Sequence, residues 1–208
     1  MLYPKSFQKL IENFASLPSV GPKMAERLVL FLFKQDPKKV QEFAENLENI
    51  QHLKSCRKCF NIAEEELCEI CRDSSRNAKA ICVVEEPLDI ISIEKTKIYN
   101  GLYHVLGGII YNDEKSQELK IPELLKRIRE EKVEEVIIAM NPTTEGDATA
   151  FYLKSKIYPV KFAEGGPAER EFNRVKISRL ARGMATGGDI EYADELTLSS
   201  ALTNRKEL

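Results

Sequence analysis

Four cysteines close together constrain this chain more than any other feature of its sequence. Cys56, Cys59, Cys68 and Cys71 have the spacing C-x2-C-x8-C-x2-C. Each C-x2-C pair places two thiolates on one side of a tight turn, and two such turns complete a tetrahedron around Zn²⁺. The alternatives are two disulfides or chance, and a cytosolic setting argues against disulfides. Because four thiolates fill the coordination shell, the pattern predicts one structural zinc ion without a metal-bound water.

The chain before these cysteines predicts helices that turn a sharp corner. We expect helices over 6–16, with Ser6 as the cap, over 22–34, and from Asp36-Pro37 to about residue 53. Pro18 and Gly21 interrupt the first two helices, and Pro22 suits the first position of a helix because its missing N–H costs nothing there.

After the cysteines, short apolar runs alternate with helical patterns, which is typical of a parallel α/β sheet. The predicted strands are "AICVVEE", "LYHVL", "EEVIIAM" and "VKISRLA", and the predicted helices are "PLDIISIEKT", "IPELLKRIREE" and "GDATAFYLKSKI". Cys82 and His104 lie within strands, so we expect both to pack in the core. Long polar connections are predicted over 106–120 and 163–174.

We therefore predict a multidomain α+β protein with four parts. They are a helical domain over 1–54, a zinc module over 55–78, an α/β domain with a mainly parallel sheet over 79–180, and a Gly-rich and helical C-terminal segment over 181–208.

Three acidic residues follow predicted strands. Glu85 ends one strand, and Glu145 and Asp147 flank Gly146 after another. Ligands gather outside the carboxyl ends of parallel strands, where such acids can hold Mg²⁺. The pattern resembles the Toprim fold of topoisomerases, primases and some nucleases. Glu145 is equally explained by the positive N-terminus of its helix. No nucleophile and no basic substrate channel is evident beside these acids.

Basic residues are concentrated near the N-terminus. The net charge is −2, but residues 1–60 carry ten Lys/Arg and six Asp/Glu, which gives +4 there and −6 elsewhere. The corner "LPSVG" between two helices has the outline of a helix-hairpin-helix, whose backbone N–H groups bind a phosphate without reading sequence. Lys23 and Arg27 are four residues apart and share a face, and Lys9 adds charge. An ordinary αα-hairpin is the alternative.

The order of these features resembles the bacterial RecR family of recombination proteins. The matching stretches are "LPSVGPKMAERL", "CRKCFNIAEEELCEIC", "ICVVEEPLDIISIE", "EEVIIAMNPTTEGDATAFYL" and "ISRLARGMATGGDIEYADELTLSSAL". The helix-hairpin-helix motif usually has glycine where Ser19 stands, and serine adopts positive φ less easily than glycine does. The segment 159–174 departs from the family pattern.

The resemblance implies a DNA-binding mediator without catalytic residues. It implies DNA contacts at the hairpin, structural Zn²⁺ on the four cysteines, a RecO-facing acidic surface around Glu145 with Glu85 and Asp147, and a C-terminal subunit contact. Such proteins form tetrameric rings that encircle DNA, whether single-stranded, double-stranded or gapped. With RecO and RecF they help load RecA onto single strands coated by single-strand-binding protein.

An alternative function is a Mg²⁺-dependent Toprim enzyme acting on phosphodiester bonds, motivated by the three acids. We expect a cytoplasmic, nucleoid-associated protein. The first residues lack the apolar core of a signal peptide, and no stretch is long and apolar enough to cross a bilayer.

Overall fold

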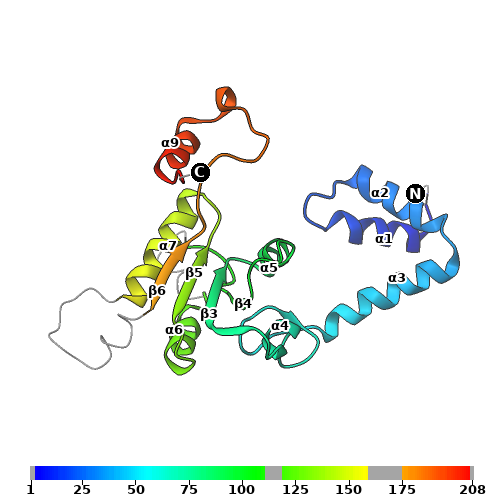
Figure 1. Cartoon of the computed structure of the whole chain (residues 1–208). Helices are drawn as coiled ribbons and strands as arrows, with labels where there is room; N and C mark the ends of the chain where they lie inside the picture. Colours follow the sequence, from blue (N-terminus) through cyan, green and yellow to red (C-terminus); the bar gives the residue numbers. More distant parts are fainter. Residues whose placement is uncertain (1–2, 111–118, 159–174, 207–208) are drawn as a thin grey trace. The chain divides into compact units, whose positions relative to one another are not determined.

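The computed structural model describes residues 3–110, 119–158 and 175–206 (Figure 1). The chain divides into two compact units, Met1–Leu53 and Lys54–Leu208, which we call unit 1 and unit 2. The departure from the family pattern at 159–174 and the centre of the predicted 106–120 loop lie outside the described residues. The predicted multidomain α+β organisation is confirmed.

Unit 1 consists of helices α1 (Lys5–Ala15), α2 (Pro22–Phe33) and α3 (Pro37–Asn49), followed by the 3₁₀ turn η1 (Ile50–His52). The side chain of Asp36 caps α3 by accepting a hydrogen bond from the N–H of Lys38 at 2.8 Å. Helices α1 and α2 lie within about a residue of their predicted positions. Helix α3 begins where predicted but ends at Asn49, and the rest of the predicted stretch to about residue 53 contains η1.

The predicted cap at Ser6 is wrong. The first helical hydrogen bond of α1 runs from the N–H of Gln8 to the carbonyl of Pro4, so the helix begins before Ser6 and places that residue inside its first turn. The extended Pro4 precedes the helix, and no side chain caps it.

Unit 2 begins with the zinc module, made of the paired strands β1 (Lys54–Ser55) and β2 (Ile62–Ala63) and the short helix α4 (Glu69–Arg72). A four-stranded sheet follows, in the order β4-β3-β5-β6. The strands are β3 (Asn77–Val84), β4 (Gly101–Val105), β5 (Glu135–Ala139) and β6 (Lys176–Arg179). Every pairing is parallel, as the alternation of strands and helices predicted.

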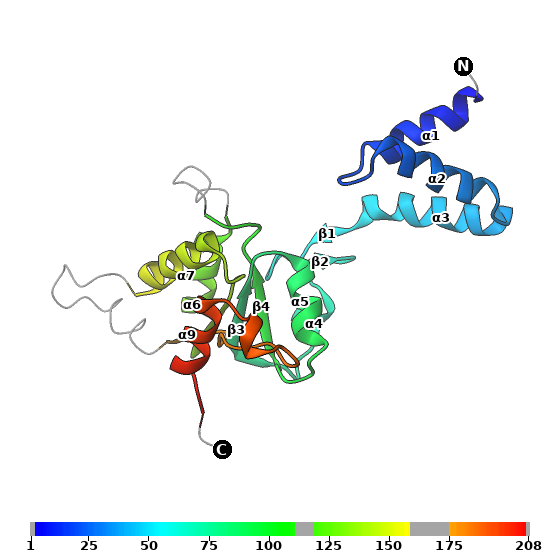
Figure 2. The ribbon, with the colours of Figure 1, turned by 90° about the horizontal axis from the view of Figure 1, so that it is seen from above.

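The two faces of this sheet bury two separate clusters of side chains. Alternate residues of β3 point to opposite faces, so Ile81 and Val83 join one cluster while Cys82 and Val84 join the other. The first cluster is covered by α6 (Ile121–Glu130) and α7 (Thr144–Ile157), and the second by α5 (Pro87–Glu94). Figures 1 and 2 show these helices on the two sides of the sheet. Cys82 is buried, as predicted.

The C-terminal part contains the 3₁₀ turn η3 (Ile190–Tyr192) and helix α9 (Glu195–Thr203), neither of which has a buried residue. Large apolar side chains remain exposed there. They are Ile190, Tyr192, Leu196 and Leu202.

Candidate nucleic-acid interface and metal centre

The connection between α1 and α2 is a tight corner held by its own backbone. The N–H of Leu17 donates to the carbonyl of Phe14, and the N–H of Val20 donates to that of Leu17. Ser19 has φ of +65°, the left-handed conformation that glycine adopts most easily. Ser19 therefore stands at the position where the hairpin motif usually has glycine, and it adopts the left-handed backbone conformation that glycine would adopt there.

The N-terminus of α2 is open to solvent. Gly21 precedes it with extended backbone, its carbonyl accepts hydrogen bonds from Met24 and Ala25, and no side chain caps the helix. The first N–H groups of a helix have no partner within it and carry partial positive charge. A Cβ built on Gly21 meets nothing within 4 Å. The fold therefore leaves this glycine free, and a backbone phosphate has room to approach.

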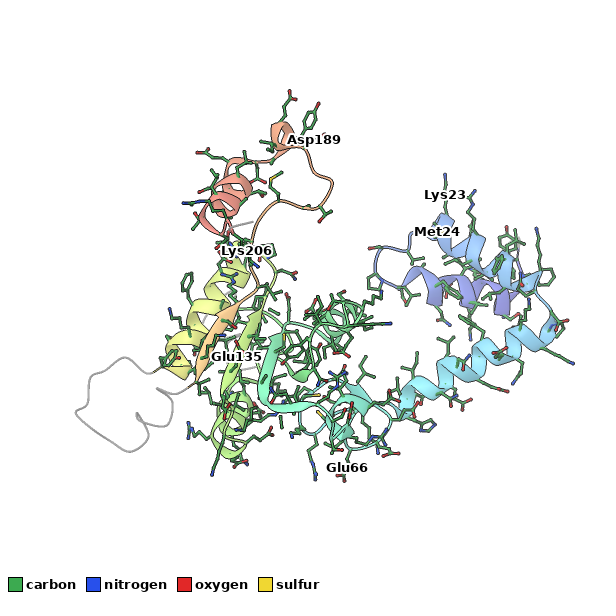
Figure 3. The ribbon with its side chains drawn as sticks, viewed as in Figure 1. Lys23, Met24, Glu66, Glu135, Asp189 and Lys206 are labelled. Atoms are coloured by element: carbon green, nitrogen blue, oxygen red, sulfur yellow. The ribbon has the colours of Figure 1, made fainter. Side chains whose placement is uncertain are left out.

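The predicted DNA-binding residues Ser19, Gly21, Lys23 and Arg27 come together at this corner, and all are exposed. Figure 3 shows Lys23 pointing outward from the start of α2. Lys9 is also exposed but lies in the middle of α1. The corner can offer main-chain donors and two cations to one anion.

The four predicted zinc ligands converge. All four Sγ atoms lie within 4.8 Å of one another, and a regular tetrahedron with Zn–S bonds of about 2.3 Å has edges of about 3.8 Å. Cys56, Cys59 and Cys68 are buried and Cys71 is half-buried. Among the described residues, this is the group of metal-binding side chains close enough to share an ion.

The thiols interact strongly with one another. Hydrogen bonds from Cys59 and Cys71 lower the pKa of Cys68 to about 2, and the hydrogen bond to Cys68 raises the pKa of Cys59. Buried thiols this close cannot all carry negative charge without a cation among them, so a divalent ion fits the chemistry of the set. Backbone turns hold the pairs in place: Phe60 donates to the carbonyl of Cys56 and Arg72 to that of Cys68.

The three predicted acids lie at the carboxyl edge of the sheet. Glu85 follows β3, and its Oε2 accepts a hydrogen bond from the side chain of Asn141 at 3.2 Å. Partial burial raises the pKa of Glu85. Glu145 and Asp147 lie in the first turn of α7, where Thr143 caps the helix by accepting from Gly146 at 3.0 Å. A Cβ at Gly146 would come within 2.1 Å of the Asn141 carbonyl oxygen, so the turn requires glycine.

Asp147 is already paired within the chain. Its Oδ1 accepts hydrogen bonds from both Arg179 and Arg182, and these, Arg182 first, lower its pKa. Sequence reasoning did not anticipate these two arginines beside the acids. The "RLAR" stretch, which begins at the last residue of β6, is the signal that would have placed both arginines at the carboxyl edge of the sheet. They also line a pocket of about 350 Å³ together with Asp89, Ser92 and Asn141.

Within the described residues, no helix is long and apolar enough to cross a membrane.

Comparison with known proteins supports the sequence resemblance over most of the chain. Four family models match: the RecR helix-hairpin-helix at residues 7–51, the RecR four-cysteine zinc finger domain at 53–73, the Toprim domain at 79–167, and the RecR C-terminal region at 183–206. The "Recombination protein RecR" of Chloroflexus aggregans is 49% identical over 203 residues, covering 96% of this chain and 93% of the relative. The protein of the same name from Chloroflexus aurantiacus is 48% identical over the same shares. The four cysteines are thus the ligands of a structural zinc ion.

Proposed function

The chain belongs to the RecR family of recombination proteins, and from this premise we propose that it binds DNA at the α1–α2 corner and mediates recombinational repair. The open N-terminus of α2, with exposed Lys23 and Arg27, carries the proposal. Main-chain N–H groups and the helix dipole bind a phosphate oxygen whatever the base sequence. The two cations add contacts that salt weakens.

Self-association is the second part of the proposal. Ala25 and Val29 are the buried apolar residues among residues 3–53, while Phe31 is 61% exposed and Phe33 77%. Large apolar side chains of α3 and of the adjoining turn η1 also remain exposed. They are Val40, Phe43, Leu47 and Ile50. A unit with so small a core needs another surface to bury these side chains.

The exposed apolar residues of η3 and α9 supply a second such surface, in unit 2. A chain with two separate self-complementary surfaces joins one neighbour through each, and closure gives a ring with an even number of subunits, here a tetramer. Several weak corners in one ring raise the affinity for DNA through effective concentration. Enclosure of this kind suits single-stranded, double-stranded and gapped DNA alike.

The acidic carboxyl edge of the sheet is the proposed surface for RecO. Asp147 is neutralised by its two arginines, so Glu145 and Glu85 carry the free charge. We further propose that the chain acts with RecO and RecF to load RecA onto single strands coated by single-strand-binding protein. This would take place in the cytoplasm, at the nucleoid. The paired state of Asp147 also supports a mediator without catalytic activity over a Mg²⁺-dependent enzyme, because the acid is not free to bind an ion.

The DNA contact is tested by charge reversal. In Lys23→Glu with Arg27→Glu, we expect affinity for gapped duplex to fall at least tenfold and the slope of log K against log salt to decrease by about two. Lys38→Glu with Lys39→Glu makes the same charge change on α3 and serves as the control. Unchanged affinity and slope in the first variant would refute the assignment.

Gly21→Val tests the backbone contact without changing charge. A Cβ at this position meets nothing within 4 Å in the fold. The valine side chain would, however, occupy the space through which a phosphate approaches the backbone. We expect weaker DNA binding with unchanged thermal stability, and normal binding would show that no phosphate reaches this corner.

Glu145→Lys tests the partner surface. RecO binding should be lost while DNA binding remains, and Glu130→Lys on the exposed side of α6 is the matched control. Normal RecO binding by Glu145→Lys would move the surface elsewhere.

Light scattering with and without DNA tests the ring, and a stable monomer would exclude it. Hydrolysis of DNA with Mg²⁺ that disappears in Glu145→Ala would favour the enzyme.

A further inference from the structure

The zinc module is joined to one edge of the parallel sheet. β4 is an edge strand, and its outward N–H at Val105 donates to the carbonyl of Cys59 at 2.8 Å. Another outward group of this strand, the carbonyl of Tyr103, accepts from the guanidinium of Arg127 at 2.6 Å. A zinc ligand thus provides the main-chain partner that a neighbouring strand would otherwise supply.

Residues on either side of Cys59 reinforce this junction. The Phe60 ring meets the buried His104 ring edge-on at 5.4 Å, and Phe60 adopts φ of +63°. Lys58 forms an ion pair at 3.3 Å with Glu131, which also binds Arg127 at 3.0 Å. Three consecutive residues of the first cysteine turn therefore contact the outer edge of β4, directly or through the side chains of α6.

The contacts continue to the carboxyl edge of the sheet. Nε2 of His104 donates to the carbonyl of Lys120 at 2.7 Å, and the N–H of Lys120 donates to the carbonyl of Leu106 at 3.0 Å. The ammonium of Lys120 lies 5.6 Å from the centre of the Phe60 ring. The segment that leaves β4 is held at its start by the zinc module.

The same segment holds the backbone of both free acids. The N–H of Gly107 donates to the carbonyl of Glu85 at 3.0 Å. The N–H of Ile110 donates to the hydroxyl of Thr149 at 2.9 Å, and that buried hydroxyl donates to the carbonyl of Glu145 at 2.8 Å. Residues 106–110 therefore connect the zinc module to the two sites where the carboxylates are anchored.

We propose that the zinc module is a positioning element for the carboxyl edge of the sheet, with Phe60 as the residue through which metal binding holds Glu85 and Glu145 in place. Removing the metal releases the Cys59 turn, then the edge of β4, then residues 106–110. This inference deepens the proposed function, because it makes the partner surface depend on zinc occupancy.

Hydrogen exchange of the DNA-free, partner-free chain tests the coupling. Phe60→Gly removes the ring while glycine keeps the positive φ. We expect one zinc per chain to remain, with exchange at Val105, Gly107 and Ile110 about two- to tenfold faster, as the loss of one ring pair implies. Chelation of the zinc should accelerate the same amides further. The matched control is Glu65→Ala, which breaks the 2.8 Å ion pair with Arg72 inside the module and should leave these amides unchanged.

His104→Gln removes the same ring contact from the sheet side and leaves the residues of the zinc module unaltered. If Phe60→Gly loses its metal, His104→Gln therefore still tests whether the ring contact couples the zinc module to residues 106–110. The two substitutions combined should accelerate exchange no more than one alone. Unchanged exchange at these amides after chelation, or in His104→Gln, would overturn the proposal. Because exchange is read without a partner, failure of the RecO assignment would not affect this result.

Discussion

Unit 1 and unit 2 bury their apolar side chains in opposite ways. In unit 2, both faces of the sheet are covered, and residues such as Ile81 and Leu153 are fully buried. In unit 1, the helices are amphipathic, but most of their large apolar side chains reach solvent. An amphipathic helix therefore shows that a partner exists without showing whether the partner belongs to the same chain.

This difference separates two sources of stability. The sheet and the zinc module of unit 2 derive their stability from their own core and metal, which are independent of protein concentration. Under the proposed self-association, the stability of unit 1 should depend on protein concentration, because association would bury its apolar faces.

The largest effect is expected at the metal. Cys68→Ser removes one ligand of a structural zinc, and the binding energy of such an ion, about 10 kcal/mol or more, is also folding energy. We expect loss of zinc and unfolding of the module, with the helices of unit 1 retained. Zinc content and circular dichroism measure both.

Cys82→Ser is the matched control for this change. It places a hydroxyl in an apolar core and should cost about 1–3 kcal/mol while zinc remains bound. Full zinc retention in Cys68→Ser would mean that the ligand set is misidentified.

The same truncation in each unit tests the comparison directly. Leu153→Ala in the core of unit 2 should destabilise the chain by about 3 kcal/mol at any protein concentration. Leu47→Ala, at a side chain that is 51% exposed, should matter mainly at concentrations where chains associate. Denaturant unfolding at several concentrations distinguishes the two, and a concentration-independent loss in Leu47→Ala would place its partner within the chain.

The smallest effect is expected at the corner. Ser19→Gly relieves a positive φ and should stabilise unit 1 by about 0.5–1 kcal/mol, after the greater freedom of glycine in the unfolded chain is subtracted. Gly21→Ala, where φ is −79°, should change stability by less than about 0.5 kcal/mol. Thermal unfolding of unit 1 measures both, and a destabilised Ser19→Gly would show that the hydroxyl has a role of its own.

Much of this structure was predictable because its signals are local. The cysteine spacing specified the metal site, and apolar runs between helical patterns specified the parallel strands. The Asp36-Pro37 start of α3 was predicted because a capping side chain acts within two residues. Ser6 shows the limit, because a preceding proline carbonyl served as the first acceptor instead.

The remaining features depend on residues far apart in the sequence. The pairing of Asp147 with Arg179 and Arg182 joins positions more than thirty residues apart, and the contact between Cys59 and Val105 depends on which strand forms the edge of the sheet. The spacing of the two arginines indicates that they lie at the carboxyl edge of the sheet, but neither their pairing with Asp147 nor the contact between Cys59 and Val105 follows from periodicity or spacing. The exposure of the apolar side chains of α3 could not be predicted either, because a sequence pattern shows which residues are apolar and not what covers them.

The two edges of the sheet differ in a way that matters for handling the protein. Lys176 and Arg179 place charges along β6, which discourages pairing with a foreign strand. At β4 the Cys59 turn covers the outward N–H of Val105 instead, so a chain stripped of its metal exposes part of this strand edge to other chains. Protein that loses its zinc to a chelating tag, or that is expressed in metal-poor medium, should therefore form aggregates rich in intermolecular β-structure. Zinc supplied during expression should prevent this aggregation.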